Sequence, residues 1–377
     1  MKRIGQALFF LILSTSISIA DDPPRTATKQ LNLFPQGFTF NSGLGFSNLA
    51  TSTIWNISAA NPASLADFPE ISAGVSMQYA SRIEDAFGFD IAYERVNPWL
   101  PQSFGLVLPF HAFRMGVGFN QKYSHSLDFG EIPILTVNNP QGSGETYHPV
   151  FETYVYSGSG MISYALPRFI NPSHGLALGA QIDVDFLRNY QEIPRLSATG
   201  TDQAISWKAG IRYRFLDLLK LGAAFEKGAS FSGNIEWEEY ALLMIPDSGF
   251  ISQSQFQDTP FTADLPDRLS FGWWLKISEQ FSLANDFSFV YWENVYSSLK
   301  NQMDISGSVY FLASEKISFS AGFYSTRWEL NDAFFMSVGI LANFKPLRME
   351  LTVADSHLAS SDTRKQTLAR LGLGVSL

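Results

Sequence analysis

The chain of 377 residues contains no cysteine, which excludes disulfide bonds and thiolate metal sites. Charge is also scarce, because only 16% of the residues are Asp, Glu, Lys or Arg, whereas soluble domains carry about 25%. The formal net charge of −9 argues against nucleic acid as a partner, since phosphate backbones call for a basic surface. The composition therefore favours neither an ordinary soluble domain nor a nucleic-acid-binding protein.

Long apolar runs are missing as well. Beyond residue 20 no stretch approaches the roughly 20 apolar residues that a membrane-spanning helix needs. At the start of the chain, Lys2 and Arg3 precede the apolar run IGQALFFLILSTSISI, which ends in small residues before Asp21. This pattern is typical of a signal peptide, so residues 1–20 are predicted to direct export. A membrane anchor is the alternative, although the run is short and interrupted by serines.

What the sequence does contain is alternation. In GLALGAQIDVDF (residues 175–186), Leu, Ile, Val and Phe occupy one side of an extended chain and Gly, Gln and Asp the other. Comparable runs recur from residue 71 to the C-terminus, each of about ten residues, the length that a tilted strand needs to cross a bilayer. A soluble sandwich would alternate too, with its apolar face on a core. In a membrane barrel that face meets lipid and the polar face lines the interior.

The connections between these runs favour the barrel. Short connections are predicted at residues 216–220, 278–280, 313–316 and 345–348. Longer ones alternate with them, at residues 189–202, 234–268, 293–301 and 355–366. Short periplasmic turns and longer external loops are the barrel pattern. Residues 234–268 are expected to form an outer loop, either as an apolar landing surface or as a short helix on the rim.

The number of strands depends on residues 71–110. Twelve strands are predicted from residue 112 onward, and residues 71–80, 86–96 and 103–110 supply three further candidates. Bacterial single-chain barrels have even strand numbers, and three prolines between residues 97 and 110 restrict ladder hydrogen bonds. We therefore predict an all-β fold: a transmembrane antiparallel β-barrel of about 14 strands over residues 71–377.

Residues 21–70 do not alternate, yet they carry more aromatic residues than a disordered linker would. A barrel of this size has a lumen wide enough to need filling. Residues 21–70 are therefore predicted to form an N-terminal hatch that plugs the lumen.

Two stretches carry a resemblance to a known family. Gly43-Leu44-Gly45-Phe46, followed by Asn61-Pro62-Ala63, resembles the hatch of the FadL-type outer-membrane transporters of hydrophobic compounds. Leu265-Pro266-Asp267-Arg268 resembles the start of a late strand in that family. The residues before Asn61 depart from the family pattern, and the C-terminal residue is Leu377 rather than Phe. Secretion-associated barrels of the PorV type resemble the same stretches.

The resemblance implies a monomer that captures a hydrophobic ligand outside and releases it through hatch rearrangement or a wall opening. The resemblance implies neither a cofactor nor a metal site. The hatch motif Asn61, Pro62 and Ala63 is expected to shape the turn from hatch to wall. Ligand contacts are expected on the hatch, although the same residues could simply pack the plug: Phe34, Phe38, Phe40, Leu44, Phe46 and Trp55.

Two pairs of charged residues are predicted to face the lumen. Asp183 and Asp185 share one side of a strand, and Arg212 and Arg214 on the next strand are plausible partners. Paired carboxylates can perform acid–base chemistry, but catalytic pairs usually face each other across a cleft. Solvated lumen charge is the favoured interpretation, and the chain is not expected to be an enzyme.

The function that the resemblance implies is passive uptake of hydrophobic small molecules, such as fatty acids or aromatic hydrocarbons, across a bacterial outer membrane. The expected partners are outer-membrane lipid and the hydrophobic ligand. A barrel that acts in protein secretion or as a scaffold is the main alternative, with secretion-machinery proteins as partners. A barrel hydrolase is a third possibility.

Overall fold

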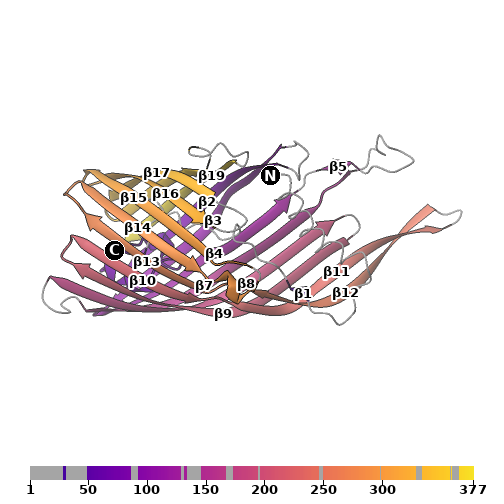
Figure 1. Ribbon diagram of the computed structural model, residues 1–377, viewed down its shortest axis with the longest axis horizontal. Helices are drawn as coiled ribbons and strands as arrows, with labels where there is room; N and C mark the ends of the chain where they lie inside the picture. Colours follow the sequence, from indigo (N-terminus) through magenta and orange to yellow (C-terminus); the bar gives the residue numbers. More distant parts are fainter. Residues whose placement is uncertain are drawn as a thin grey trace.

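The computed structural model describes residues 29–30, 49–85, 92–128, 131–133, 146–166, 173–193, 196–245, 249–297, 299–327, 333–356, 358 and 365–377. Fourteen of the described strands close into one antiparallel barrel (Figure 1). The barrel closes where β19 pairs with β2 and where β10 pairs with both β9 and β13. The wall strands are β2 (Ser72–Asp85), β3 (Ala92–Phe110), β4 (Phe113–Asp128), β7 (Val150–Leu166), β8 (His174–Ile193), β9 (Leu196–Phe215), β10 (Leu219–Lys227), β13 (Arg268–Lys276), β14 (Phe281–Val290), β15 (Gln302–Ser314), β16 (Ile317–Arg327), β17 (Ala333–Phe344), β18 (Leu347–Asp355) and β19 (Lys365–Ser376).

The predicted barrel of about 14 strands is confirmed, and the structure explains why fifteen candidates reduce to fourteen. Residues 92–96 of the first candidate and all of the candidate 103–110 lie in a single strand, β3, which runs through Pro98, Pro101 and Pro109, whereas residues 86–91 lie outside the described residues. The β2–β3 ladder shifts register twice, next to Met77 and next to Gln78. The second shift leaves Pro98 outside the regular pairing, where its missing N–H does no harm, whereas Pro101 and Pro109 stay opposite Met77 and Arg114.

The connection predicted at residues 234–268 is also different from the expectation. It consists largely of a β-hairpin, β11 (Ser230–Ile245) and β12 (Gly249–Asp264), and contains no helix among its described residues. β11 pairs with the first residues of β9, so residues 189–202 are mostly strand rather than loop. The hairpin extends away from the barrel (Figure 1). The backbone N–H and C=O groups of the hairpin pair with each other in water as well as in a membrane. The two strands can therefore continue beyond the bilayer.

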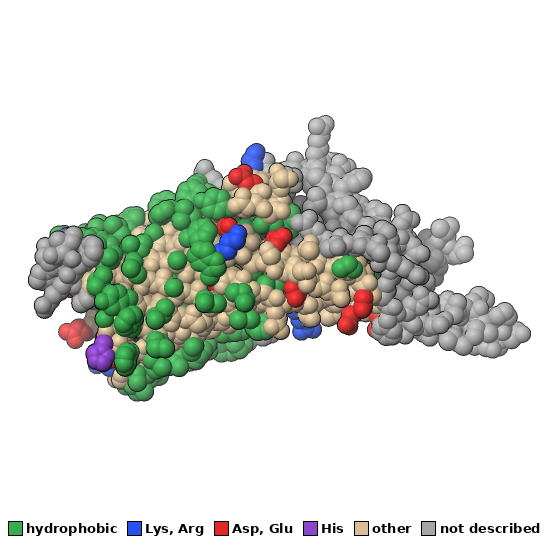
Figure 2. Space-filling model, turned by 90° about the horizontal axis from the view of Figure 1, so that it is seen from below, with side chains coloured by type: hydrophobic (Ala, Val, Ile, Leu, Met, Phe, Trp, Pro, Cys, Tyr) green, Lys and Arg blue, Asp and Glu red, His purple; other side chains and the backbone are tan. Residues whose placement is uncertain are grey.

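The outer surface of the barrel is apolar. On β9, Ile205 is 73% exposed and Trp207 45%, whereas the neighbouring Lys208 is buried in the interior at 5%. Hydrophobic side chains gather over the barrel strands on the face seen in Figure 2. Exposure of so many apolar side chains to water would be unfavourable, so the outer surface of the barrel faces membrane hydrocarbon. The apolar side of GLALGAQIDVDF therefore faces lipid, with Ile182 62% exposed.

The two ends of the barrel differ. Tight turns such as residues 345–346 join the strands at one end, here called the turn end. The opposite end, here called the loop end, carries the β11–β12 hairpin, the short pair β5 (Ile132–Pro133) and β6 (Thr146–Tyr147), and the 3-10 helix η5 (Trp292–Asn294). In membrane barrels short turns are periplasmic and long loops external. No helix among the described residues is long and apolar enough to cross a membrane.

Candidate functional site: the plugged lumen

The lumen is filled near the turn end by residues 49–70, here called the plug. It contains two 3-10 helices, η3 (Ile54–Asn56) and η4 (Pro62–Asp67). η3 contacts β2, β3 and β19, and η4 contacts the next strands around the wall, β4, β7, β8 and β9. Ile57 and Leu65 are fully buried. The plug therefore packs against a continuous arc of seven neighbouring wall strands, from β19 to β9.

Asn61 and Pro62 begin η4 and also join it to the wall. Asn61 Oδ1 accepts a 3.0 Å hydrogen bond from the Ala63 N–H, the arrangement of a helix N-cap, and proline follows at the first helical position. Asn61 Nδ2 donates to the carbonyl oxygens of Ile211 at 3.0 Å and Ala223 at 3.2 Å. The motif thus shapes the chain locally and fastens it to β9 and β10.

Glycines on the inner face of the wall make room for the plug. A Cβ added at Gly179 would overlap the backbone of Pro62 and Ala63, and one at Gly210 would overlap the side chain of Asn61. At Gly372 the added carbon would meet the indole of Trp55. The glycine-rich polar sides of the alternating runs are therefore the footprint of the plug.

A buried ion cluster lies between plug and wall on the β4–β10 side. The Lys122 ammonium lies 2.8 Å from Asp183 Oδ2, 3.0 Å from Asp185 Oδ1 and 3.3 Å from Glu226 Oε1. Lys208 Nζ lies 3.4 Å from Glu226 Oε2. Both aspartates are 0% exposed. Because isolated buried charges are very costly, the cluster must stay intact for this part of the lumen to be stable.

The ion cluster reaches the plug through two polar side chains. Lys208 Nζ lies 3.3 Å from the Ala59 carbonyl oxygen, and Gln181 Nε2 donates to the Ser58 carbonyl oxygen at 2.7 Å. Gln181 also donates to Asp183 Oδ1 at 2.8 Å. Plug and ion cluster are therefore one hydrogen-bonded unit.

The predicted partners of the lumen charges are different in the structure. Arg212 pairs with Asp67 of the plug instead of Asp183 or Asp185. In the β8–β9 ladder Arg212 lies opposite Ala177, whereas Asp183 lies opposite Ser206, a separation of about 20 Å along the strand. Arg214 lies opposite Gly175, still nearer the turn end. All four residues belong to the barrel, but only the two aspartates share one cluster.

A second polar contact holds η3 against the wall at β19. Arg370 of β19 is 3% exposed, and its Nη2 donates to Asn56 Oδ1 at 3.3 Å and to Ser76 Oγ at 3.2 Å. The Ser103 hydroxyl donates to the Trp55 carbonyl oxygen. Trp55 is 1% exposed and packs against the wall at Gly372. The other five residues predicted to contact ligand, at positions 34, 38, 40, 44 and 46, lie outside the described residues.

Toward the loop end part of the inner face is apolar, although Asn189 of β8 is also buried there. On β8 the inward positions change from Asp183 and Asp185 to Leu187, which is 2% exposed. Leu187 belongs to a buried apolar cluster built by β4, β7, β8, β9 and the β11–β12 hairpin. We call it the outer apolar cluster; it contains Tyr123, Val155, Leu187, Ala198, Ala204, Ala229, Phe231, Ile235, Trp237, Phe261, Ala263 and Leu265.

The wall ladder is incomplete between β3 and β4. These strands pair from Phe110 with Phe113 as far as Ser103 with Asn120, while β4 continues to pair with β7 as far as Asp128. Just beyond Asn120, the β4–β7 ladder shifts register between Gln121 and Tyr123. A bulge re-aims side chains, and here it lies at Lys122, which enters the ion cluster. Alternation alone does not reveal this residue, because the bulge breaks the alternation.

No protein-family model matches the chain, and no curated protein matches it. Solved structures do. The toluene transporter TodX of Pseudomonas putida is 14% identical with a TM-score of 0.64, over 93% of this chain and 99% of that one. The toluene transporter TbuX of Ralstonia pickettii is 11% identical with a TM-score of 0.63, over 90% and 98%. A FadL homologue of Pseudomonas aeruginosa is 13% identical with a TM-score of 0.59, over 93% and 100%.

These similarities extend over nearly the whole length of both chains, so they concern the complete barrel. Together with the apolar outer surface and the contrast between short turns and long loops, they identify an outer-membrane barrel. The chain therefore has the fold of the FadL-type outer-membrane transporters.

Proposed function

We propose that this protein is a passive outer-membrane channel for small hydrophobic molecules, gated by its plug. The observation that carries the proposal is the order of surfaces along the lumen. An apolar cluster lies toward the external end, and a buried ion cluster with a hydrogen-bonded plug lies toward the periplasmic end. Transfer of an apolar solute from water to the apolar cluster is favourable, whereas contact with the ion cluster does not stabilise it.

A path through the wall fits this order. A solute collected at the outer apolar cluster meets the ion cluster below it, and the stretch of β4 beyond Asn120, which pairs with β7 but not with β3, lies beside that position. We propose that the solute leaves sideways there or after movement of the plug. The neighbours TodX and TbuX are described as toluene transporters, which supports a hydrocarbon as solute. The predicted ligand contacts on residues 34–46 remain part of the proposal.

The test is uptake by vesicles that contain the full chain. Toluene should enter these vesicles faster than empty ones, while a small sugar should enter both at the same rate. Equal toluene entry with and without the protein would contradict the proposal. A stable complex with periplasmic or secreted proteins in place of solute uptake would instead support the secretion-associated alternative.

A further inference from the structure

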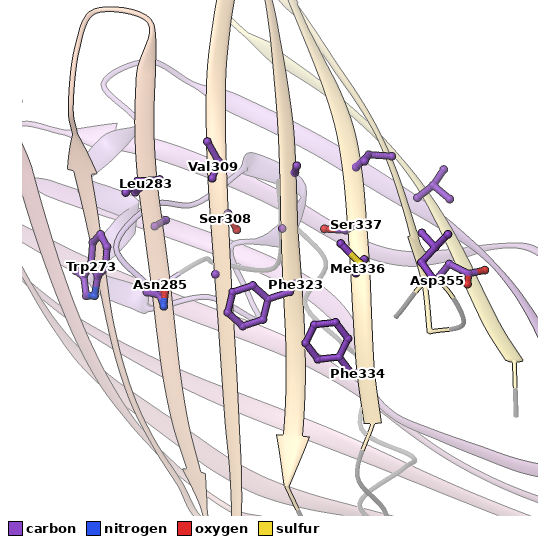
Figure 3. Close-up of a pocket in the computed structure, with 17 residues that line it drawn as sticks. Trp273, Leu283, Asn285, Ser308, Val309, Phe323, Phe334, Met336, Ser337 and Asp355 are labelled. Atoms are coloured by element: carbon purple, nitrogen blue, oxygen red, sulfur yellow. The ribbon is translucent and has the colours of Figure 1, made fainter. Parts of the chain in front are cut away.

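The outer wall carries a furrow that the lumen and its plug do not explain. It has a volume of about 580 Å³ and crosses β13 to β18 (Figure 3). Its walls include Val309, Phe323 and Met336, which are 45%, 36% and 42% exposed on the outer face. Because these side chains belong to the lipid-facing alternation, the furrow opens to membrane hydrocarbon rather than to the lumen.

One row of cross-strand neighbours forms the floor of the furrow. Gly307 of β15 has no side chain, and the ring of its cross-strand neighbour Phe323 lies over it. A Cβ at position 307 would lie 2.5 Å from the Phe323 ring. The complete row across the six strands is Trp273, Asn285, Gly307, Phe323, Met336 and Asp355.

The row rises from the middle of the membrane to its outer edge. Asn285 lies midway along β14, whereas Asp355 is the last residue of β18, at the loop end. Four strand spacings separate them, about 19 Å in all. With strands tilted by about 40°, the row climbs about 12 Å, close to the roughly 15 Å that one leaflet of a hydrocarbon core occupies. Along the membrane normal, the furrow therefore extends about as far as one lipid chain.

The two ends of the row are polar. At the outer end Asp355 accepts a hydrogen bond from the Thr367 hydroxyl at 2.5 Å and presents a carboxylate at the membrane edge. Its negative charge favours a head group with an amine over a purely anionic one. At the inner end the carboxamide of Asn285 interrupts the apolar floor, since contact between an amide and hydrocarbon is unfavourable.

We propose that this furrow is a binding site for one acyl chain of an outer-leaflet lipid with an amine-bearing head group. The chain lies along the row from Asp355 toward Asn285, and its methylenes pack against the exposed sides of Met336, Phe323 and Val309. This site is separate from the solute path, so its test does not depend on the transport proposal.

The experiment measures lipid retained by the purified full chain in mild detergent, by native mass spectrometry with phosphatidylethanolamine as the probe. The wild-type barrel should retain one lipid. Ala321→Leu adds an outward side chain inside the furrow and should reduce retention about tenfold, the ratio expected when about two methylenes lose their contacts. Ala321 is exposed, so its enlargement meets no buried neighbour.

The matched control is Ala209→Leu on β9, an exposed outward alanine outside the furrow. It should retain lipid like the wild type. Equal retention by Ala321→Leu and wild type, or equal loss in Ala209→Leu, would overturn the proposal. Equal binding of phosphatidylglycerol would overturn the head-group assignment, and a dimer without lipid would replace the lipid with a second copy.

Discussion

Asn61 and Ile211 are 150 residues apart in the sequence, yet the Asn61 side-chain amide donates a 3.0 Å hydrogen bond to the Ile211 carbonyl oxygen. This bond joins the plug to the barrel wall at a point where the wall has a glycine, Gly210, in place of a side chain. The plug is therefore fitted to the wall by a specific polar contact and a specific steric gap. Each can be altered separately.

Replacing Asn61 with Ala should loosen the plug. The change removes the helix cap and the two hydrogen bonds to the carbonyl oxygens of Ile211 and Ala223, each worth about 0.5–1.5 kcal/mol. Leakage of a small polar dye from vesicles should rise. Asn61→Asp keeps the capping oxygen but loses the amide donor, so a leak in this variant as well would assign the effect to the wall contact. Two sealed variants would argue against that contact as a fastening.

Enlarging a glycine under the plug should have the same effect by sterics. Gly179→Ala places a methyl group against the backbone of Pro62 and Ala63, and overpacking of this kind costs about 1–3 kcal/mol. A lower unfolding temperature, a faster dye leak, or both should result. Gly158→Ala is the matched control, because a Cβ there has nothing within 4 Å. If the two variants behave alike, the glycine footprint has no role in holding the plug.

Removing the cation of the ion cluster should destabilise the barrel. Lys122→Met leaves Asp183 and Asp185 buried beside each other without their shared counter-ion, and breaking a buried pair costs about 3–5 kcal/mol. Urea unfolding in micelles measures the loss. Adding Asp183→Asn to the same chain should restore part of the stability by removing one uncompensated charge. A double variant no more stable than Lys122→Met would show that the cluster is not electrostatically coupled.

A charge on the outer face should impair insertion. Val338 is 62% exposed and lies in the middle of β17, so Val338→Arg should destabilise the inserted barrel by about 2–4 kcal/mol. Val338→Leu should be neutral. The yield of folded protein in vesicles provides the measurement, and a normal yield for the arginine variant would place Val338 outside the hydrocarbon.

Deletion of residues 21–60 tests the plug as a whole. The shortened chain keeps the wall strands but loses Trp55 and most of the contacts with β2, β3 and β19. Small solutes should then leak through the lumen, which single-channel conductance in planar bilayers detects directly. A closed barrel after the deletion would mean that the wall side chains alone seal it.

Much of the barrel follows from the sequence. Alternation assigns Ile205 and Trp207 to lipid and Lys208 and Arg212 to the interior, as the structure has them, because a strand has only two faces and each tolerates one class of side chain. The even strand number has a different reason. A barrel whose first and last strands both have their free ends at the turn end must cross the membrane an even number of times. The signal peptide at residues 1–20 and the domain boundaries remain predictions.

The tertiary structure decided what alternation cannot express. Register shifts let residues 92–96 and 103–110 belong to one strand and placed Lys122 in the ion cluster, because such irregularities depend on the neighbouring strand. The pairing of Arg212 with Asp67 rather than with Asp183 depends on where the plug lies in the lumen. A period-two pattern determines which face a residue occupies. Which residues meet across a closed barrel is set by the stagger of its strands and by the chain that fills it, and neither is encoded locally.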